Sequence, residues 1–254
     1  MLLLHRLTPF AIGIAMTTTL VATSFYPLIA PWALPLLLLG VFFLMARLAD
    51  FRYREKDFWG LIATPVTFSL ASCLLFVLAD NGSVRLAIAF ACGFLISFYE
   101  EHLFRFVHLP AAYQAYGLQN TSGVMSILTM FYFAAAGYAV LSFIRVPLVI
   151  LSVAMFVIWL LVSLSAFWMA KVPRDRASLY ALAGAVLFTE LFVAASYLPT
   201  PFMTNGAFLA VLFYIFIGLS RANVLSKLSR VVIRRYVGVG TIMLMALLIT
   251  AKWM

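Results

Sequence analysis

The sequence is poor in charge. Asp, Glu, Lys and Arg make up only 10% of its 254 residues, whereas soluble domains contain about 25% charged residues. Hydrophobic residues account for 66% of the chain, and the mean hydropathy is +1.11. A soluble fold of this length cannot bury so much apolar surface, so we expect the chain to have lipid as its solvent.

Cysteine and histidine are also scarce. Cys73 and Cys92 lie inside apolar runs, and neither belongs to a CxxC motif or a Cys/His cluster, which argues against a disulfide framework or a zinc site. The sequence contains no dinucleotide, P-loop, haem or flavin signature, so it predicts no cofactor. The formal charge is +9, but the basic residues lie between apolar segments. This pattern favours the lipid bilayer over nucleic acid as a partner.

Long apolar runs dominate what is present. A helix needs roughly 20 apolar residues to cross a bilayer, and nine runs approach that length: 9–26, 28–46, 59–79, 86–106, 122–144, 147–170, 178–198, 207–224 and 233–252. The sequence therefore predicts an all-α, polytopic integral membrane protein with eight to nine transmembrane helices in one bundle. We expect the first run to be retained in the mature protein, because no signal-peptide cleavage pattern follows it.

The positive charges predict the orientation of these spans. Short cytoplasmic loops of membrane proteins collect Lys and Arg. With nine spans and a cytoplasmic N-terminus, fourteen of the seventeen basic residues fall on the cytoplasmic side, and only Arg85, Arg145 and Lys252 fall outside.

The loops between the runs are short, and the sequence shows no linker or internal repeat. We expect residues 1–254 to form a single domain. Residues 107–121 combine proline, tyrosine, glycine and amides, which is typical of an interfacial or re-entrant segment. Residues 197–206 contain two prolines and an Asn-Gly pair, which predicts an outer loop with a turn.

The stretch from Phe98 to Pro110, FYEEHLFRFVHLP, ends an apolar run with two carboxylates, an arginine and two histidines. Ionisable groups in hydrocarbon are costly unless they are paired or hydrated, so each is a candidate functional residue. On a helix, Glu101 and Arg105 share one face, and Glu100 points about 100° away. We therefore expect a Glu101–Arg105 ion pair and a separate environment for Glu100.

Two further kinds of polar residue need an interpretation. On one helix, His102 and His108 do not converge on a shared point with Glu101, so we predict a hydrogen-bonded or interfacial His102 and no metal site. Glu190 is the remaining carboxylate inside an apolar run. At 1.5 Å per residue it lies roughly 10–12 Å from the outer face, against about 20 Å for Glu100, which is too far for a tight dyad.

The hexapeptide EEHLFR, with Glu100, Glu101 and Arg105, resembles the EExxxR motif of the CAAX-protease and bacteriocin-processing family of glutamic intramembrane proteases. That resemblance implies a helical bundle with this motif on a central span. It also implies that the two glutamates form the polar core of a site, that one of them acts as a general base, and that Arg105 is their electrostatic partner. His102, His108 and Glu190 would be accessory groups.

The rest of that family's motif set is missing. Gly137 stands where the FxxxH motif of the next span has its histidine, and no histidine follows His108. Glu190 is followed four residues later by Ala194 rather than asparagine. The resemblance therefore implies a diverged protein without peptidase activity that binds a membrane-embedded substrate, protein or peptide. If the protein were an enzyme, the resemblance would imply a glutamic-type hydrolase. The closing stretch YLPTPFMTNGAFLAVLFY is also similar to uncharacterised multi-spanning proteins of candidate-phylum bacteria, in keeping with a location in the cell (inner) membrane.

Two other functions remain open. The protein can be a transporter or channel subunit that uses Glu100, Glu101 and Glu190 for a cation or proton, or an assembly subunit whose charges fix helix packing. A water-filled cavity at Glu100 would favour the diverged-protease reading, and a path from Glu100 to Glu190 would favour transport. Fully paired charges in a dry bundle would favour assembly.

Overall fold

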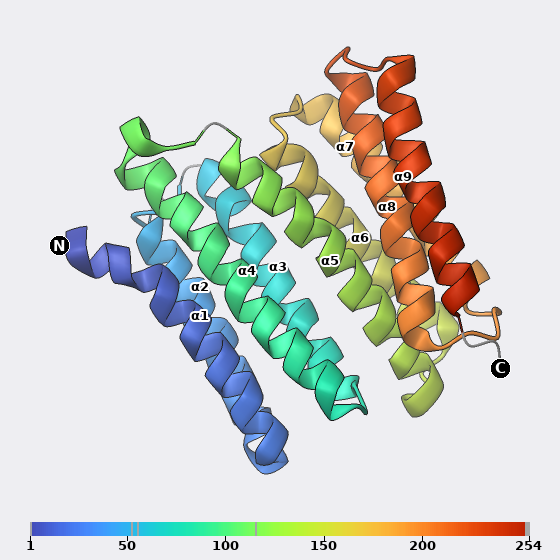
Figure 1. Ribbon diagram of the computed structural model, residues 1–254, viewed down its shortest axis with the longest axis horizontal. Helices are drawn as coiled ribbons and strands as arrows, with labels where there is room; N and C mark the ends of the chain where they lie inside the picture. Colours follow the sequence, from blue (N-terminus) through green and yellow to red (C-terminus); the bar gives the residue numbers. More distant parts are fainter. Residues whose placement is uncertain (1, 52, 55, 115, 252–254) are drawn as a thin grey trace. The chain divides into compact units, whose positions relative to one another are not determined.

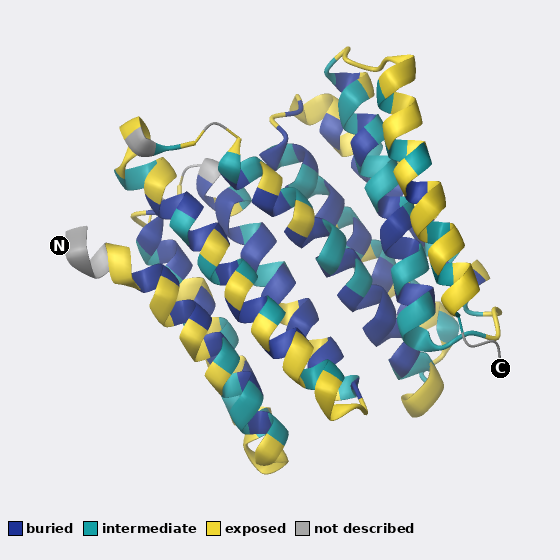
Figure 2. Ribbon diagram, viewed as in Figure 1, coloured by how far each residue is buried: buried dark blue, intermediate teal, exposed yellow. Residues whose placement is uncertain are grey.

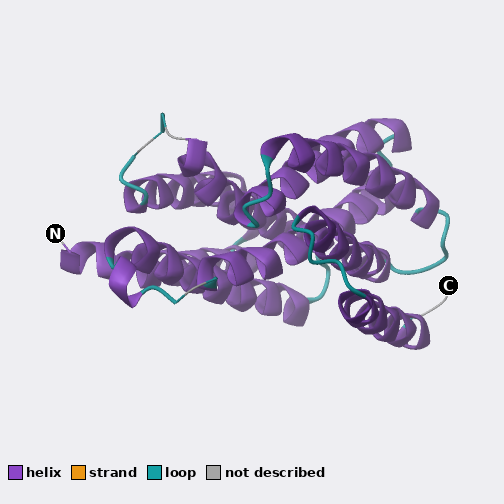
Figure 3. Ribbon diagram, turned by 90° about the horizontal axis from the view of Figure 1, so that it is seen from above, coloured by secondary structure: helices purple, strands orange, loops and turns teal. Residues whose placement is uncertain are grey.

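The computed structural model describes residues 2–51, 53–54, 56–114 and 116–251, and within these ranges it contains helices and loops but no strand (Figure 3). Nine of the described helices are long and apolar enough to cross a membrane. The prediction of an all-α protein with nine membrane-length helices is confirmed over the described chain. Arg52 and Lys252, which contribute to the charge count, lie outside the described residues.

The helices fall into two compact units, Met1–Met125 and Ser126–Met254, which are described separately. Unit 1 contains the first four helices and the beginning of α5 (Gly117–Ala139): α1 (Leu2–Phe25), α2 (Ala30–Leu48), α3 (Lys56–Leu78) and α4 (Gly82–His108). Unit 2 contains the rest of α5 and four helices: α6 (Leu148–Met169), α7 (Arg174–Ala195), α8 (Phe202–Val224) and α9 (Arg230–Thr250). Short 3₁₀ turns, η1 (Pro27–Ile29) and η2 (Pro110–Ala112), and a π-helical turn, η3 (Val140–Ile144), lie between helices.

In unit 1, α1 packs along α4 although the two helices are distant in sequence (Figure 1). Two glycines allow this approach. A Cβ atom on Gly13 would lie 2.6 Å from the carbonyl oxygen of Gly93, and a Cβ atom on Gly93 would lie 2.7 Å from that of Gly13. Because a side-chain carbon does not tolerate such distances, only glycine lets these backbones come so close. The Ser97 hydroxyl also donates to the Pro9 carbonyl oxygen at 2.9 Å, which links the two helices.

Helix α4 is longer than the apolar run that predicts it. It begins at Gly82 because the Asn81 side chain accepts a hydrogen bond from the Ser83 amide at 2.8 Å and so caps the helix. It ends at His108, shortly before Pro110, which cannot continue a helix. The segment predicted at 107–121 therefore consists of the end of α4, the turn η2, and the start of α5 at Gly117.

In unit 2, α6 packs along α7 and α8 packs along α9 (Figure 1). The prediction of an Asn-Gly turn within 197–206 is wrong, because Asn205 and Gly206 lie inside α8. A Cβ atom on Gly206 would lie 2.8 Å from the Ala135 Cβ, so this glycine permits a close crossing with α5. The Thr200 hydroxyl donates to the Asn205 side chain. Helix packing therefore overrides the local turn preference of this pair.

Helix α9 contacts little besides α8. Gly240 is its one buried residue among those described, and most of the helix is exposed (Figure 2). Its exposed side chains are mainly apolar, which suits a helix that faces lipid.

Candidate functional site

The end of α4 contains an ion pair. Both Nε and Nη2 of Arg105 lie 2.7 Å from Oε1 of Glu101, one helical turn away. The predicted Glu101–Arg105 pair is thus confirmed. Because both contacts use Oε1, the second carboxylate oxygen is not engaged by Arg105. The Glu101 side chain is 26% exposed and the Arg105 side chain is 45% exposed, so the pair can contact a further polar group.

Glu100 lies in a different environment. The residue is 0% exposed, and neither of its carboxylate oxygens has a hydrogen-bond partner among the described residues. A buried, unpaired carboxylate would cost several kcal/mol in such surroundings. The two adjacent glutamates therefore lie in distinct environments. Glu101 faces an open side of the helix, and Glu100 is held inside unit 1.

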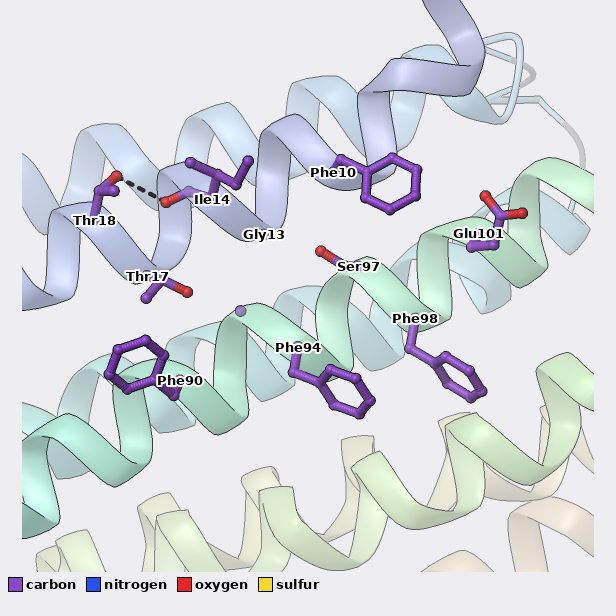
Figure 4. Close-up of a pocket in the computed structure, with 11 residues that line it drawn as sticks. Phe10, Gly13, Ile14, Thr17, Thr18, Phe90, Phe94, Ser97, Phe98 and Glu101 are labelled. Atoms are coloured by element: carbon purple, nitrogen blue, oxygen red, sulfur yellow. Dashed lines mark hydrogen bonds between the residues drawn. The ribbon is translucent and has the colours of Figure 1, made fainter.

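A groove of about 540 Å³ runs between α1 and α4, with Glu101 at one end. Most of its wall is apolar, and three of its phenylalanines, Phe90, Phe94 and Phe98, follow one another at four-residue spacing along α4. Figure 4 shows Phe10 and Thr17 of α1 directed toward α4, and Ser97 directed toward α1. The lining residues are Phe10, Gly13, Ile14, Thr17, Thr18, Phe90, Gly93, Phe94, Ser97, Phe98 and Glu101.

The hydroxyl groups of the groove are already used within the protein. Thr17 donates to the Ala89 carbonyl oxygen at 3.4 Å and Thr18 donates to the Ile14 carbonyl oxygen at 2.7 Å. The Ser97 hydroxyl likewise bonds to α1. The groove is therefore mainly apolar, and it ends at Glu101, which is paired with Arg105. Its volume falls within the roughly 300–1,000 Å³ of typical ligand pockets.

The two histidines of the segment pack separately. His102 is buried, its ring meets Phe98 edge-on at 4.6 Å, and a Cβ atom on Gly117 would lie 2.8 Å from its Nδ1. His108 stacks on Phe104 at 5.2 Å, and its Nε2 lies 3.8 Å from Asp50. Within the described part of the chain, no group of three or more His, Cys, Asp or Glu side chains is arranged to hold a metal ion.

The remaining residues of the predicted site belong to unit 2. Gly137 packs inside that unit, where a Cβ atom on it would lie 3.1 Å from the Phe192 ring and would also meet Met155. A histidine at this position would collide with both side chains. Glu190 is exposed on α7 and forms no ion pair among the described residues.

Sequence reasoning missed the groove, although a signal for it exists. Gly13 and Thr17 on one apolar run, and Gly93 and Ser97 on another, each follow the small-xxx-small spacing of close helix crossings. That spacing marks faces that approach another helix. It does not say which helix is the partner. The groove forms because α1 packs along α4.

Comparison with known proteins gives one match. The model of a family described as a protein of unknown function, DUF5656, matches residues 59–250. No curated protein and no solved structure matches the chain significantly.

Proposed function

The chain belongs to the DUF5656 family, whose function is unknown, and we propose that it is a membrane-embedded binding protein without peptidase activity. The ligand is an apolar chain lying within the bilayer, such as the acyl chain of a lipid or lipid-linked molecule. It occupies the groove between α1 and α4.

The observation that carries this proposal is the combination of the groove with the charged pair at its end. Exposed aromatic and aliphatic side chains line the length of the groove, including Phe94, Phe10 and Ile14. At the end, Glu101 presents a carboxylate oxygen, and Arg105, which pairs with Glu101, lies outside the lining residues. Such an arrangement suits a ligand with a long apolar part and one polar group that donates a hydrogen bond to Glu101.

The absence of peptidase activity is part of the proposal. The hexapeptide EEHLFR supports a distant relation to the glutamic intramembrane proteases, in which an acidic pair activates water. In this chain Glu100 is buried without a hydrogen-bond partner among the described residues, and Gly137 packs against apolar side chains. A general base needs a reachable water molecule and a partner that accepts or donates the proton. Binding without cleavage fits these residues better.

The proposal includes a location and an orientation. We place the protein in the cell (inner) membrane of a bacterium as an integral multi-pass protein, with the N-terminus in the cytoplasm. The distribution of Lys and Arg supports this orientation. It puts the Glu101–Arg105 end of the groove toward the cytoplasmic face.

The proposal is tested by photolabelling the full-length protein in liposomes that contain a phospholipid with a diazirine on one acyl chain. We expect labelled peptides to concentrate in α1 and α4 around the groove. Ile14→Trp places a larger side chain in the groove and should reduce this labelling severalfold. Leu39→Trp is the matched control, because Leu39 is an exposed residue of α2 outside the groove.

Equal labelling of α2 and of the groove helices would contradict the proposal, since it would show only the lipid that surrounds any membrane protein. So would unchanged labelling in Ile14→Trp. Cleavage of a membrane peptide that is lost in Glu100→Gln would overturn the non-peptidase part.

A further inference from the structure

Glu190 is a carboxylate on the exposed face of a membrane-length helix. It lies five residues before the end of α7, or roughly 8 Å along the helix axis. Its exposed neighbours on that face are Val186, Leu187 and Ala194, and none of them can neutralise a charge. No ion pair or hydrogen bond to the Glu190 side chain occurs among the described residues. A charge in this position calls for a partner.

An apolar groove of about 420 Å³ lies between α6 and α7, and two of its lining residues, Thr189 and Val193, flank Glu190 along α7. Glu190 itself is not one of the lining residues. Thr189 and Val193 of α7 form one wall, and residues from Leu148 to Phe156 of α6 form the other. The two hydroxyl groups in the walls are directed to their own helices. Ser152 donates to the Leu148 carbonyl oxygen and Thr189 donates to the Ala185 carbonyl oxygen, each at 2.7 Å. The groove thus offers an apolar surface, and Glu190 is exposed on the same helix as Thr189 and Val193.

A second charge lies at the same end of unit 2. Arg145 is exposed, precedes the groove wall by three residues, and forms no ion pair among the described residues. Its φ of 59° is left-handed, a conformation that costs energy in a residue with a side chain. Every other described Lys or Arg of unit 2 lies at the opposite ends of these helices: Lys171, Arg174, Arg176, Arg221, Lys227, Arg230, Arg234 and Arg235.

We propose that the α6–α7 groove of unit 2 is a self-association surface, on which Glu190 of one copy pairs with Arg145 of a second copy. In a two-fold symmetric interface each residue pair occurs twice, so both charges of both copies are neutralised. Arginine suits this role because its stem is apolar and its guanidinium binds a carboxylate with two hydrogen bonds. The apolar walls of the groove provide the packing between the two copies.

The charges favour a second copy over an unrelated partner helix. An unrelated helix with a lysine would neutralise Glu190 and leave Arg145 unexplained. A lipid phosphate would satisfy Arg145 and leave Glu190 in hydrocarbon. A second copy satisfies both with residues that the chain already has.

The test measures association of the full-length protein in liposomes by Förster transfer between labelled copies. Glu190→Arg and Arg145→Glu, each studied alone, place like charges opposite each other in both pairs. Each should weaken self-association by about tenfold or more. A mixture of the two variants restores both pairs, since the first variant carries two arginines and the second carries two glutamates. The mixture should associate to within about threefold of the unchanged protein.

Arg176→Glu is the matched control, because it makes the same change of charge on an exposed residue at the other end of α7. It should leave association unchanged. The mixture also controls for folding, because molecules that fail alone must associate when they are combined.

Three results would overturn the proposal: a protein that is monomeric at every lipid ratio, single variants that associate normally, or a mixture that associates no better than its components. The last result would mean that Glu190 and Arg145 do not pair between copies.

Discussion

At the scale of single residues, the two adjacent glutamates of α4 show how one helical step separates two environments. Glu101 is paired with Arg105 and borders the α1–α4 groove. Glu100, about 100° further around the helix, is buried and has no hydrogen-bond partner among the described residues. A buried polar group in this state lowers stability, and proteins keep such groups where function needs them.

Replacing Glu100 should therefore not destabilise the protein. Glu100→Gln removes no hydrogen bond and should leave the free energy of unfolding nearly unchanged. Glu100→Leu also removes the desolvated carboxyl group, and should raise the free energy of unfolding by about 1–3 kcal/mol. Thermal unfolding of the purified protein in detergent measures both effects.

Arg105→Ala serves as the comparison. It breaks an ion pair that is partly exposed, so its loss should be small. If Glu100→Gln and Glu100→Leu both lowered the free energy of unfolding by more than about 1 kcal/mol, Glu100 would have a structural partner.

At the scale of helices, the strength of each pattern decides what the sequence can predict. Nine apolar runs predict nine helices, because a membrane span must satisfy every backbone group internally and be long enough to cross the bilayer. The Glu101–Arg105 pair follows from helical spacing alone. The turn predicted at Asn205-Gly206 is wrong because Gly206 serves the contact with Ala135. The small-residue spacing of Gly13 and Gly93 predicts close helix crossings, but the groove does not follow from it because the spacing does not say which helix packs against which.

The crossing of α1 and α4 gives a prediction at this scale. Gly93→Leu places a side chain against the Gly13 backbone, and it should lower the free energy of unfolding by about 1–3 kcal/mol. The loss should be accompanied by weaker photolabelling of the groove, because Gly93 lines the groove and the added side chain occupies part of it. Thermal unfolding and photolabelling of the same preparation test both parts.

Gly40→Leu is the control for that variant. Gly40 is also a glycine inside a membrane-length helix, but no heavy atom lies within 4 Å of a Cβ atom built on it. Its substitution should change stability by no more than about 0.5 kcal/mol. Similar losses of unfolding free energy from both substitutions would show that the close α1–α4 crossing does not cause the loss in Gly93→Leu.

At the scale of the whole molecule, charge is unevenly divided between the units. Unit 1 contains seven basic and six acidic residues, whereas unit 2 contains ten basic and two acidic residues. Eight of those ten basic residues lie at one end of the unit 2 helices. Such an excess is typical of the cytoplasmic side of a membrane protein, where it also meets anionic lipid.

This distribution predicts the topology. Ser226 lies between α8 and α9 at the basic end, and Ser142 lies in η3 at the opposite end; both are exposed. A membrane-impermeant maleimide should label Ser142→Cys on intact cells, and it should label Ser226→Cys only after lysis. The natural Cys73 and Cys92 are buried and should add little background. Labelling of Ser226→Cys on intact cells would reverse the proposed orientation.

We expect the groove that runs over the α1–α4 crossing to hold an apolar ligand. An experimental structure of the full-length protein in a lipid bilayer would show directly whether the groove holds a ligand. We expect an elongated density along Phe90, Phe94 and Phe98 whose polar end lies beside Glu101. A groove closed by Phe10 and Ile14 packed directly onto α4, with no density in it, would contradict this expectation.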